Sequence, residues 1–328
     1  MGSCQCNDKN KDDCAVVVEE SIKKQERIQF MTARPEISAA AAQALCKGYL
    51  ERKSYKNDHL LTTYMTSSAL SLLPSEARNT LMNILKLTPM SLKKGISYIR
   101  LIDGSSYYGN INQSNKPHGE GEKYTLDGVY TYGNWIDGEI SGQGVMVYNN
   151  GDYYKGNFMS GKFHGQGILR TIDAQSYDGS WLLGKQHGYG IEKWPDGSLF
   201  EGTFLNGKKH GKGKFMWNDG SMYQGDFKEN QISGIGIYRW SDGREYSGDW
   251  VNNVMHGKGT FTWPDGRSYE GDYVDDKKEG FGVFKWPDGK KYEGNWKNGK
   301  QHGIAVITDE NGSMRKGEWV DGKRIRWV

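Results

Sequence analysis

Several features that are common in proteins are scarce in this sequence of 328 residues. Its four cysteines, Cys4, Cys6, Cys14 and Cys46, lie near the N-terminus, so disulfides cannot join the rest of the chain and a reducing compartment is expected. No apolar run approaches the ~20 residues that a membrane-spanning helix needs. The N-terminus also shows no hydrophobic signal-peptide core.

Aliphatic side chains are scarce too, and the mean hydropathy is −0.78. In contrast, aromatic residues make up 12% of the chain and there are 45 glycines, roughly twice the average glycine frequency. So many rings argue against general disorder, and so few aliphatics argue against a thick core. A thin β structure held together by aromatic rings fits both observations.

The net charge of +3 is unevenly distributed along the chain. Residues 1–94 hold 14 Lys/Arg and 10 Asp/Glu, whereas residues 95–328 hold 29 and 30. Neither part is basic enough to indicate a nucleic-acid surface, so we expect no nucleic-acid partner.

Sequence patterns that carry chemistry are also missing. We find no P-loop, Ser-His-Asp order, His-Glu-x-x-His pair or paired-cysteine metal site. The sequence therefore predicts a protein that is not an enzyme and needs no cofactor.

A single repeat spacing dominates the chain from residue 95 onward. A glycine between two aromatic residues recurs at a constant spacing, after a slightly longer first step, at Gly109, Gly133, Gly156, Gly179, Gly202, Gly225, Gly248, Gly271, Gly294 and Gly317. A second glycine series keeps the same period, from Gly119 to Gly303. We therefore predict a repeat domain over 95–328.

Each repeat is predicted to be a β-hairpin. Tyr-x-Gly-x-Trp alternates with the period of a strand, and Asn-Gly or a relative supplies a tight turn. Gly-x-Gly then opens a return strand, and Pro-Asp-Gly or a relative supplies the next turn. Hairpins joined end to end give one antiparallel meander.

The stretches YEGNWKNGKQHGIA, YKGNFMSGKFHGQG and YDGSWLLGKQHGYG resemble MORN repeats, and the resemblance covers most of the chain, over 95–328. It implies a mostly β protein: an elongated, single-layer antiparallel β-meander solenoid, here preceded by a small α-helical region. Some copies depart from the pattern. Asn230, Asn253 and Asp276 replace the turn glycine, and Ala174 and Ala305 replace two others.

The aromatic rings of the repeats are the predicted binding residues. Because glycine lacks Cβ, a ring can lie flat on a neighbouring strand, and rows of such rings would form a groove for a helix or peptide of a partner protein. The predicted ring positions are Trp135, Tyr154, Phe158, Tyr177, Trp181, Phe200, Phe204, Tyr223, Phe227, Tyr246, Trp250, Tyr269, Tyr273, Tyr292 and Trp296.

Six of the seven histidines precede a glycine of the second series. A zinc site needs ligands that converge on one ion, whereas repeats would place these histidines in a row. Ser141, Ser233 and Glu279 occupy the same position in other copies. We therefore predict no metal site, and a histidine that holds a turn by packing and hydrogen bonding.

The N-terminal segment 1–34 is predicted to be a flexible tail with an acylation signal. After removal of Met1, Gly2 would accept myristate, and Cys4 and Cys6 would accept palmitate, which supplies the second signal that stable attachment needs. Cys6 stands where Ser or Thr is usual. The alternative is a disordered tail with incidental cysteines.

Residues 35–94 are predicted to be a helical region and a linker. The stretch AQALCKGYLERKSY resembles an IQ motif through Gln43, Lys47, Gly48, Arg52 and Tyr55, although Ala42 replaces the usual bulky aliphatic residue. The resemblance implies binding of calmodulin or a related light chain. The alternative is a helix that covers the open edge of the sheet.

Two functions remain open from the sequence. The first is a scaffold that binds a partner protein, tethered to the inner face of a membrane at the cell cortex or placed in a ciliary cytoskeleton. It could form a homodimer through its terminal repeats, near residues 324–328. The alternative is a phospholipid-binding targeting module, for which the sequence offers the local cluster Lys208, Lys209, Lys212 and Lys214.

Overall fold

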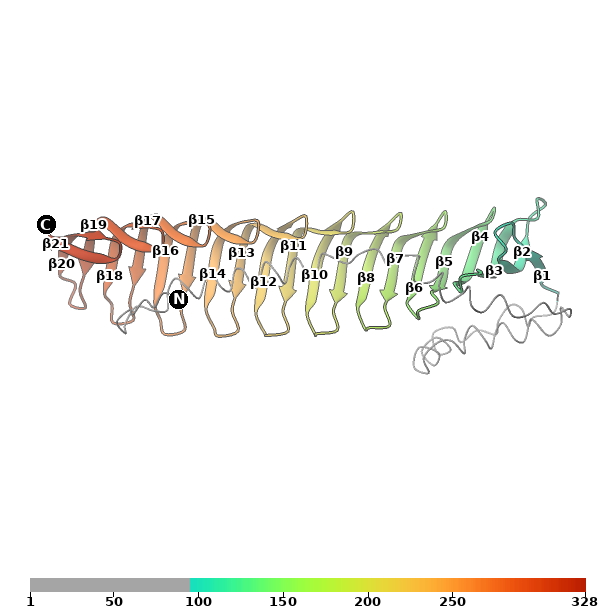
Figure 1. Cartoon of the computed structure of the whole chain (residues 1–328), viewed down its shortest axis with the longest axis horizontal. Coiled ribbons are helices and arrows are strands. Elements are labelled where there is room, and N and C mark those ends of the chain that lie inside the picture. The colour runs from blue at the N-terminus through green and yellow to red at the C-terminus, as the bar shows by residue number, and fades with distance from the viewer. Residues whose placement is uncertain (1–94) are drawn as a thin grey trace, which may run out of the picture. The chain divides into compact units, whose positions relative to one another are not determined.

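The computed structural model describes residues 95–328. These residues form 21 strands assigned to one open antiparallel sheet, in which each strand pairs with the next one in the chain (Figure 1). The predicted β-meander of hairpins is confirmed. The predicted tail and helical region, 1–94, lie outside the described residues.

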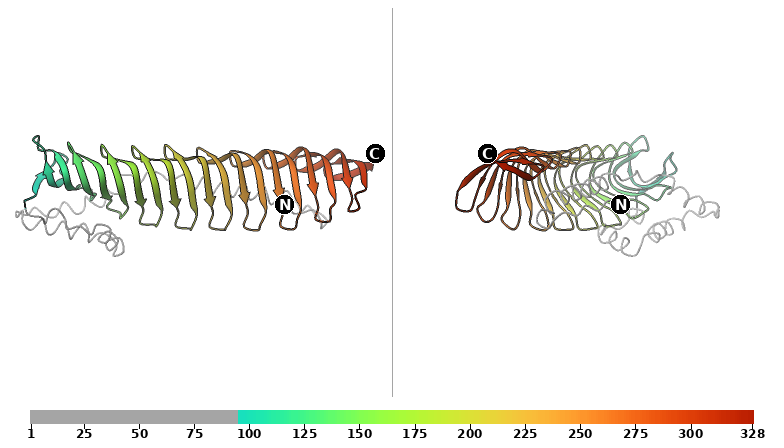
Figure 2. Two further views of the ribbon diagram at one scale, coloured as in Figure 1. Left: turned by 180° about the vertical axis from the view of Figure 1, so that it is seen from behind. Right: turned by 60° about the vertical axis from the view of Figure 1, so that its left-hand side comes forward.

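The described residues fall into two compact units, which we treat separately. The N-terminal half comprises 95–197 and 204–207, and the C-terminal half comprises 198–203 and 208–328, so that β10 (Leu199–Leu205) contributes to both. Within each half the strands form a single layer and follow one another in chain order (Figures 1 and 2). Because a single layer has no second sheet to cover it, each repeat must bury its side chains against its neighbours.

The strands of the N-terminal half are β1 (Ser97–Arg100), β2 (Ser106–Ile111), β3 (Pro117–Tyr124), β4 (Tyr130–Ile136), β5 (Glu139–Val147), β6 (Tyr153–Met159), β7 (Lys162–Arg170), β8 (Ser176–Leu182) and β9 (Lys185–Lys193). The strands of the C-terminal half are β11 (Lys208–Met216), β12 (Met222–Lys228), β13 (Gln231–Arg239), β14 (Glu245–Val251), β15 (Val254–Thr262), β16 (Ser268–Val274), β17 (Lys277–Lys285), β18 (Lys291–Lys297), β19 (Lys300–Thr308), β20 (Met314–Val320) and β21 (Lys323–Trp327).

A row of paired glycines crosses the strands of each half. Gly248 on β14 is paired with Gly236 on β13 and with Gly259 on β15. The tyrosine two residues before Gly248 lies over this row, since a Cβ on Gly259 would stand 2.4 Å from the Tyr246 ring. Tyr246 itself is completely buried. Glycine is required here because it has no side chain, and not because of its conformational freedom.

The glycine that follows each histidine has a different role. Gly257 has φ +64°, and the register of β14 and β15 shifts between Gly248 and Trp250. This is a β-bulge, for which a residue with positive φ is required. Asp249 satisfies the backbone that the bulge frees, because its Oδ2 accepts the N–H of Lys258 at 2.9 Å.

Residues 112–116 close the first hairpin, and two-residue turns close the hairpins that follow it. Both residues of each two-residue turn have positive φ, as in a type I′ turn. Asn252 and Asn253, for example, have φ 49° and 71°. The turns of successive repeats are also bonded together. The N–H of Asn253 donates to the carbonyl of Ile232 at 2.9 Å, and its Oδ1 accepts the N–H of Ile232 at 2.7 Å.

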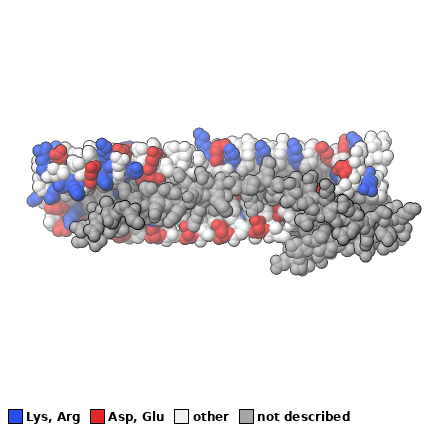
Figure 3. Space-filling view, viewed as in Figure 1, with Lys and Arg blue, Asp and Glu red and all other residues white. Residues whose placement is uncertain are grey.

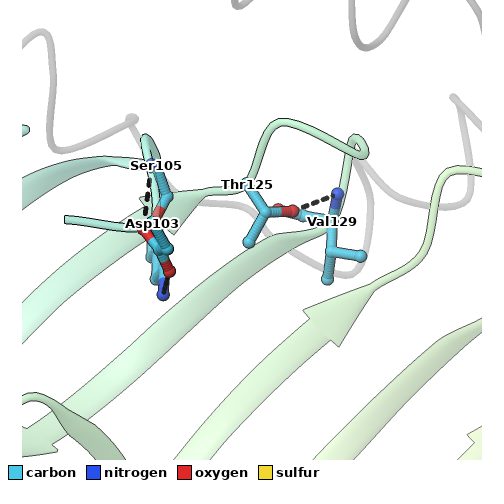
Figure 4. Close-up of polar contacts among 5 residues, drawn as sticks. Asp103, Ser105, Thr125 and Val129 are labelled. Carbon is cyan, nitrogen blue, oxygen red and sulfur yellow. Dashed lines mark hydrogen bonds and ion pairs between the residues drawn. The ribbon is translucent and has the colours of Figure 1, made fainter. Parts of the chain in front are cut away.

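Five-residue loops join one hairpin to the next at the other edge of the sheet. In the loop that begins at Trp263, the Asp265 carboxylate accepts the N–H of Arg267 at 3.1 Å. Figure 4 shows two variants near the start of the sheet: Asp103 binds the N–H of Ser105, whereas the Thr125 hydroxyl accepts the N–H of Val129. A short polar side chain thus fixes each of these loops.

Candidate functional site

The side of each half that carries the tyrosines and tryptophans of the Tyr-x-Gly-x-Trp strands will be called the ring face. Tyr154 shows how the tyrosine is held: its ring would lie within 2.1–2.5 Å of a Cβ on Gly167, and its hydroxyl donates to the carbonyl of Asn157 at 2.8 Å. The same hydrogen bond, from the hydroxyl to the carbonyl of the residue three positions later, is made by Tyr107, Tyr177, Tyr223, Tyr246, Tyr269 and Tyr292.

The aromatic residue at the end of the strand links one repeat to the one before it. Trp250 contacts Tyr246 of its own repeat and Tyr223 of the preceding one, both edge-to-face, with ring centroids 5.1 and 5.6 Å apart. Its Nε1–H donates to the carbonyl of Gly236 at 3.2 Å. Trp135, Trp181 and Trp296 make the equivalent bond. Edge-to-face pairs of this kind stabilise by roughly 0.5–1.5 kcal/mol each beyond simple burial.

Burial raises the pKa of the tyrosines that lie on the glycine row. The pKa of Tyr107 in the N-terminal half and of Tyr292 in the C-terminal half rises from 10.0 to about 12. Burial likewise raises the pKa of Tyr154 and Tyr246. These phenols are therefore neutral hydrogen-bond donors at neutral pH, not reactive groups.

All fifteen aromatic residues predicted to line a groove lie on the ring face, and all are buried, with at most 7% of their surface exposed. They form the core of the sheet by packing on one another. Their predicted contact with a partner stays a prediction.

A further aromatic series, the loop tryptophans, is absent from the predicted binding residues; the repeat pattern assigns these tryptophans to the return strand, whereas the structure places them in the loops. Trp217, Trp240, Trp263 and Trp286 begin successive five-residue loops in the C-terminal half, at the same spacing as the glycine series. Because that spacing is visible in the sequence, the series could have been found there. Trp217 is buried, whereas Trp240, Trp263 and Trp286 are half-buried.

In each of these repeats a second aromatic residue lies two positions before the loop tryptophan. Rings of the two series alternate in space and form one continuous chain of contacts. Tyr238 contacts Trp217 at 5.2 Å and Trp240 at 4.5 Å between ring centroids. Phe261 contacts Trp240 at 5.1 Å and Trp263 at 4.4 Å. We call this chain of rings, which runs from Phe215 to Trp286, the loop ladder; Phe284 continues it from Trp263 to Trp286.

Cations border the loop ladder. The Arg244 guanidinium lies 5.3 Å from the centre of the Trp240 ring and is paired with Asp242 at 2.7 Å. Arg267 repeats this arrangement with Trp263 and Asp265. In Figure 3, Asp and Glu side chains recur along the lower edge, which is the edge of the five-residue loops. The ladder is therefore flanked by both cations and carboxylates.

Lys278 is a buried cation on the ring face. Its Nζ lies 5.0 or 5.1 Å from the ring centres of Trp263, Tyr269, Phe284 and Trp296, and only 8% of the residue is exposed. Four rings around one ammonium group provide cation–π stabilisation. The cage is filled by the chain's own lysine, so it is part of the core.

The histidine position faces the first turn residue of the following repeat. Glu279, which replaces histidine, accepts the N–H of Asn298 at 2.8 Å, and His256 Nδ1 lies 3.6 Å from Asp275 Oδ1. The packing role predicted for the histidines is visible. The expected hydrogen bond is not made through Nδ1: this atom is buried and has no hydrogen-bond partner in His164, His187, His210, His256 and His302. Within 95–328 no three His, Cys, Asp or Glu side chains are grouped to hold a metal ion.

The remaining predicted site residues lie outside the described part of the chain. They are the acylation residues Gly2, Cys4 and Cys6 and the calmodulin-binding residues Gln43, Lys47, Gly48, Arg52 and Tyr55. Within the described range, no helix is long and apolar enough to cross a membrane.

Two solved structures to which the chain is similar are distant likenesses. The TCP10 domain of Danio rerio CPAP in complex with a peptide of STIL is 12% identical, with 71% of this chain and 99% of that chain covered and a TM-score of 0.36. The Drosophila melanogaster SAS-4 (dCPAP) TCP domain in complex with a proline-rich motif of Ana2 (dSTIL) is 16% identical, with 55% and 90% covered and a TM-score of 0.28. Neither likeness bears on function.

No curated protein matches the chain. The family described as MORN repeat, in contrast, matches eight tandem segments: 132–153, 154–173, 177–199, 200–222, 223–243, 246–266, 269–291 and 292–314. Together these segments span more than half of the chain. The hairpins, paired glycines and stacked rings described above are what these segments build, and the chain belongs to the MORN-repeat family.

Proposed function

We propose that this chain is a non-enzymatic scaffold that binds a partner protein through the loop ladder of its C-terminal half. The observation that carries the proposal is the half-buried state of Trp240, Trp263 and Trp286. These large rings keep solvent-accessible surface next to Arg244 and Arg267, whereas the rings of the core do not. Tryptophan and arginine are the residues most enriched at energetically important positions of protein interfaces.

The lysine cluster supports a protein partner over a phospholipid. Lys208 is paired with Glu229, and Lys212 is paired with Asp226 at 2.7 Å. Lys209 is buried against the Phe200 ring, with its Nζ 5.2 Å from the ring centre. Three of the four lysines that would recognise a phosphorylated headgroup are therefore engaged within the sheet, and recognition would have to break those contacts.

A matched pair of double variants tests the proposal. Pro264→Glu with Pro287→Glu places charge directly after Trp263 and Trp286, at exposed positions. Leu126→Glu with Ile172→Glu changes exposed residues at the same loop position in the N-terminal half. The full-length chain and both variants would be purified from cells under identical conditions, and the co-purifying proteins quantified.

We expect the C-terminal variant to lose at least about tenfold of a specific partner, about 1.4 kcal/mol of binding free energy, while the N-terminal variant retains it. Equal recovery with both variants, or equal loss, would show that the loop ladder is not the binding surface.

We further propose that acylation of Gly2, Cys4 and Cys6 places this scaffold at the inner face of a membrane, at the cell cortex or in a cilium. The support is the sequence pattern, and two acyl chains would suffice for stable attachment. Membrane fractionation of the full chain and of Gly2→Ala tests it. We expect the chain with its original sequence to pellet with membranes and the Gly2→Ala variant to stay in the supernatant. Equal distribution of the two would refute acylation as the targeting signal.

The IQ-like stretch carries a separate proposal, that residues 42–55 bind calmodulin or a related light chain. Its support is the spacing of Gln43, Lys47, Gly48, Arg52 and Tyr55. Binding of purified calmodulin to the full chain, with and without calcium, should be lost when Gln43 and Arg52 are both changed to Ala. Calmodulin that binds this variant as well as the original chain would contradict the proposal.

A further inference from the structure

The face opposite the ring face carries a regular pattern at the two-residue-turn edge of the C-terminal half. In each hairpin, the last residue of the first strand lies directly across from the first residue of the return strand, so both side chains point to the same face. The first of these pairs is Lys228 with Gln231. The four that follow, which together we call the turn strip, are Val251 with Val254, Val274 with Lys277, Lys297 with Lys300, and Val320 with Lys323.

Three valines of the turn strip are exposed although they are apolar, and Val254 is half-buried. Val251, Val274 and Val320 show 44%, 43% and 43% of their surface. Single exposed apolar residues are ordinary. These three occupy one position of the repeat and stand in a row that Lys297 interrupts once. Packing of the sheet does not use this surface.

The lysines of the turn strip make no ion pair within residues 95–328. In the same half, Lys258 is paired with Asp272 at 2.5 Å and Lys290 with Asp288 at 2.9 Å, so carboxylates are available where the fold places them near a lysine. Lys277, Lys300 and Lys323 are exposed and have no such neighbour. In Figure 3, Lys and Arg side chains recur along the upper edge, the edge of the two-residue turns.

We propose that the turn strip docks an acidic amphipathic α-helix of a partner protein. Two strands separate one repeat from the next, so successive pairs of the strip stand roughly 9–10 Å apart. Seven residues of an α-helix advance about 10.5 Å. Positions that recur every seven residues on such a helix therefore meet successive pairs of the strip. Apolar residues at these positions meet the valines, and Asp or Glu on the same side of the helix meets Lys297 and the other unpaired lysines.

The small size of the strip's apolar side chains favours a helix over a lipid surface. Interfacial binding to a bilayer depends on large residues such as Trp, Phe and Leu that reach into the acyl region. The turn strip offers only valine among its apolar residues, in a band at most one pair of residues wide. A helix can bury such a narrow band in one apolar seam, while the lysines supply charge complementarity. This surface lies on the opposite face from the loop ladder, so the inference does not depend on the proposed function.

The test uses the full chain and a labelled probe peptide of three heptads, with Leu at the a and d positions and Glu at the e and g positions. A scrambled peptide of the same composition controls for charge alone. The strip variant is Lys277→Glu, Lys300→Glu and Lys323→Glu. The control variant, Lys285→Glu, Lys291→Glu and Lys316→Glu, changes the net charge equally at exposed positions outside the strip. Circular dichroism confirms that both variants are folded.

We expect the heptad peptide to bind the original chain and the control variant alike, and the strip variant at least about tenfold more weakly. Absence of binding to the original chain, equal binding to the strip variant, or equal binding of the scrambled peptide would overturn the proposal.

Two further measurements distinguish other occupants. If the strip variant alone loses binding to vesicles that contain phosphatidylserine, while the peptide does not bind, the strip contacts lipid and the proposal is wrong. If the strip variant alone changes the sedimentation coefficient of the protein, the occupant is a second copy of this chain, and the proposal is again wrong.

Discussion

The two halves of the sheet share one backbone plan but differ in what covers their ring faces. In the C-terminal half the position two residues before each loop holds Phe215, Tyr238, Phe261 and Phe284, and the loops begin with tryptophan. In the N-terminal half the same two positions hold a mixture: Lys123, Met146, Leu169 and Glu192, and then Leu101, Thr125, Tyr148, Thr171 and Trp194. The loop ladder thus belongs to the C-terminal half.

The difference separates what the fold requires from what it tolerates. Both halves keep the glycine row and most of the tyrosines over it, so these residues build the sheet in both. Because the N-terminal half folds into the same hairpins without a loop ladder, the ladder is an addition to the fold. Tyr148 and Trp194 are also half-buried rings at the loop position, but the continuous chain of ring contacts is confined to the C-terminal half. A continuous row of large, half-buried rings is the pattern expected of a binding surface.

The largest effect should appear in both halves alike, at alkaline pH. The pKa of Tyr107 and of Tyr292 is raised from 10.0 to about 12 by burial, so the folded state holds the phenol protons more tightly than the unfolded state. The stability that these neutral phenols contribute is present below about pH 10 and is lost as the pH rises through about 12.

We therefore expect the β-sheet signal in circular dichroism to collapse in that window, together with the last portion of the tyrosinate absorbance. Complete tyrosinate formation while the sheet remains intact would contradict the burial of these phenols.

The next largest effect should come from filling the glycine row, again equally in both halves. Gly236→Ala places a Cβ 2.2 Å from the Tyr223 hydroxyl, and Gly167→Ala places one 2.1 Å from that of Tyr154. Since neither ring can move away from its buried site, each change should cost about 3 kcal/mol of unfolding free energy. Gly289→Ala is the control, because no atom lies within 4 Å and only its φ of +91° is unfavourable; it should cost about 1 kcal/mol. Urea unfolding gives the comparison, and equal costs at all three sites would mean that the rings do not require the glycines.

The third prediction separates the halves. Trp240→Ala removes ring contacts with Tyr238 and Phe261, and should cost about 2 kcal/mol of unfolding free energy. Thr171→Ala, at the same position of the N-terminal half, removes the hydrogen bonds of its hydroxyl to the exposed Asp173 carboxylate and to the Gln175 carbonyl, and should cost about 1 kcal/mol. Thermal unfolding of both variants measures the difference. Similar losses of unfolding free energy in the two variants would show that the ring contacts of the loop ladder stabilise the sheet no more than the equivalent position of the N-terminal half does.

The smallest effect concerns the two-residue turns. The C-terminal half places Asn253 where the N-terminal half has Gly184, and Asn253 Oδ1 accepts the N–H of Ile232 at 2.7 Å. Asn253→Gly should therefore lose about 1 kcal/mol of unfolding free energy. Gly184→Asn should gain a few tenths, by offering the N–H of Phe163 the same acceptor. Chemical denaturation of the two variants checks the opposite signs, and destabilisation by both would show that the cross-repeat bond is particular to its site.

Much of the plan follows from short stretches of sequence. The alternation of Tyr-x-Gly-x-Trp, the Asn-Gly turns and the loops with Asp-Gly each specify a local backbone conformation. Repetition of these stretches at a constant spacing then forces the same register in every copy. Some departures from the repeat pattern could also be interpreted from the sequence. Asn230, Asn253 and Asp276 replace the turn glycine and do adopt positive φ, of 71°, 71° and 66°.

What the sequence by itself determined is thus the period, the hairpins and the family. Only the tertiary structure decided which aromatic rings are buried in the core. Trp250 is buried and packs edge-to-face with Tyr223 of the preceding repeat. Trp217 and Trp240 begin equivalent loops, yet Trp217 is buried and Trp240 is half-buried. The hydrogen bond from Ile232 to Asn253 likewise joins residues 21 positions apart. Each of these outcomes depends on contacts between repeats, whereas the alternation within one repeat reports only the conformation of that repeat.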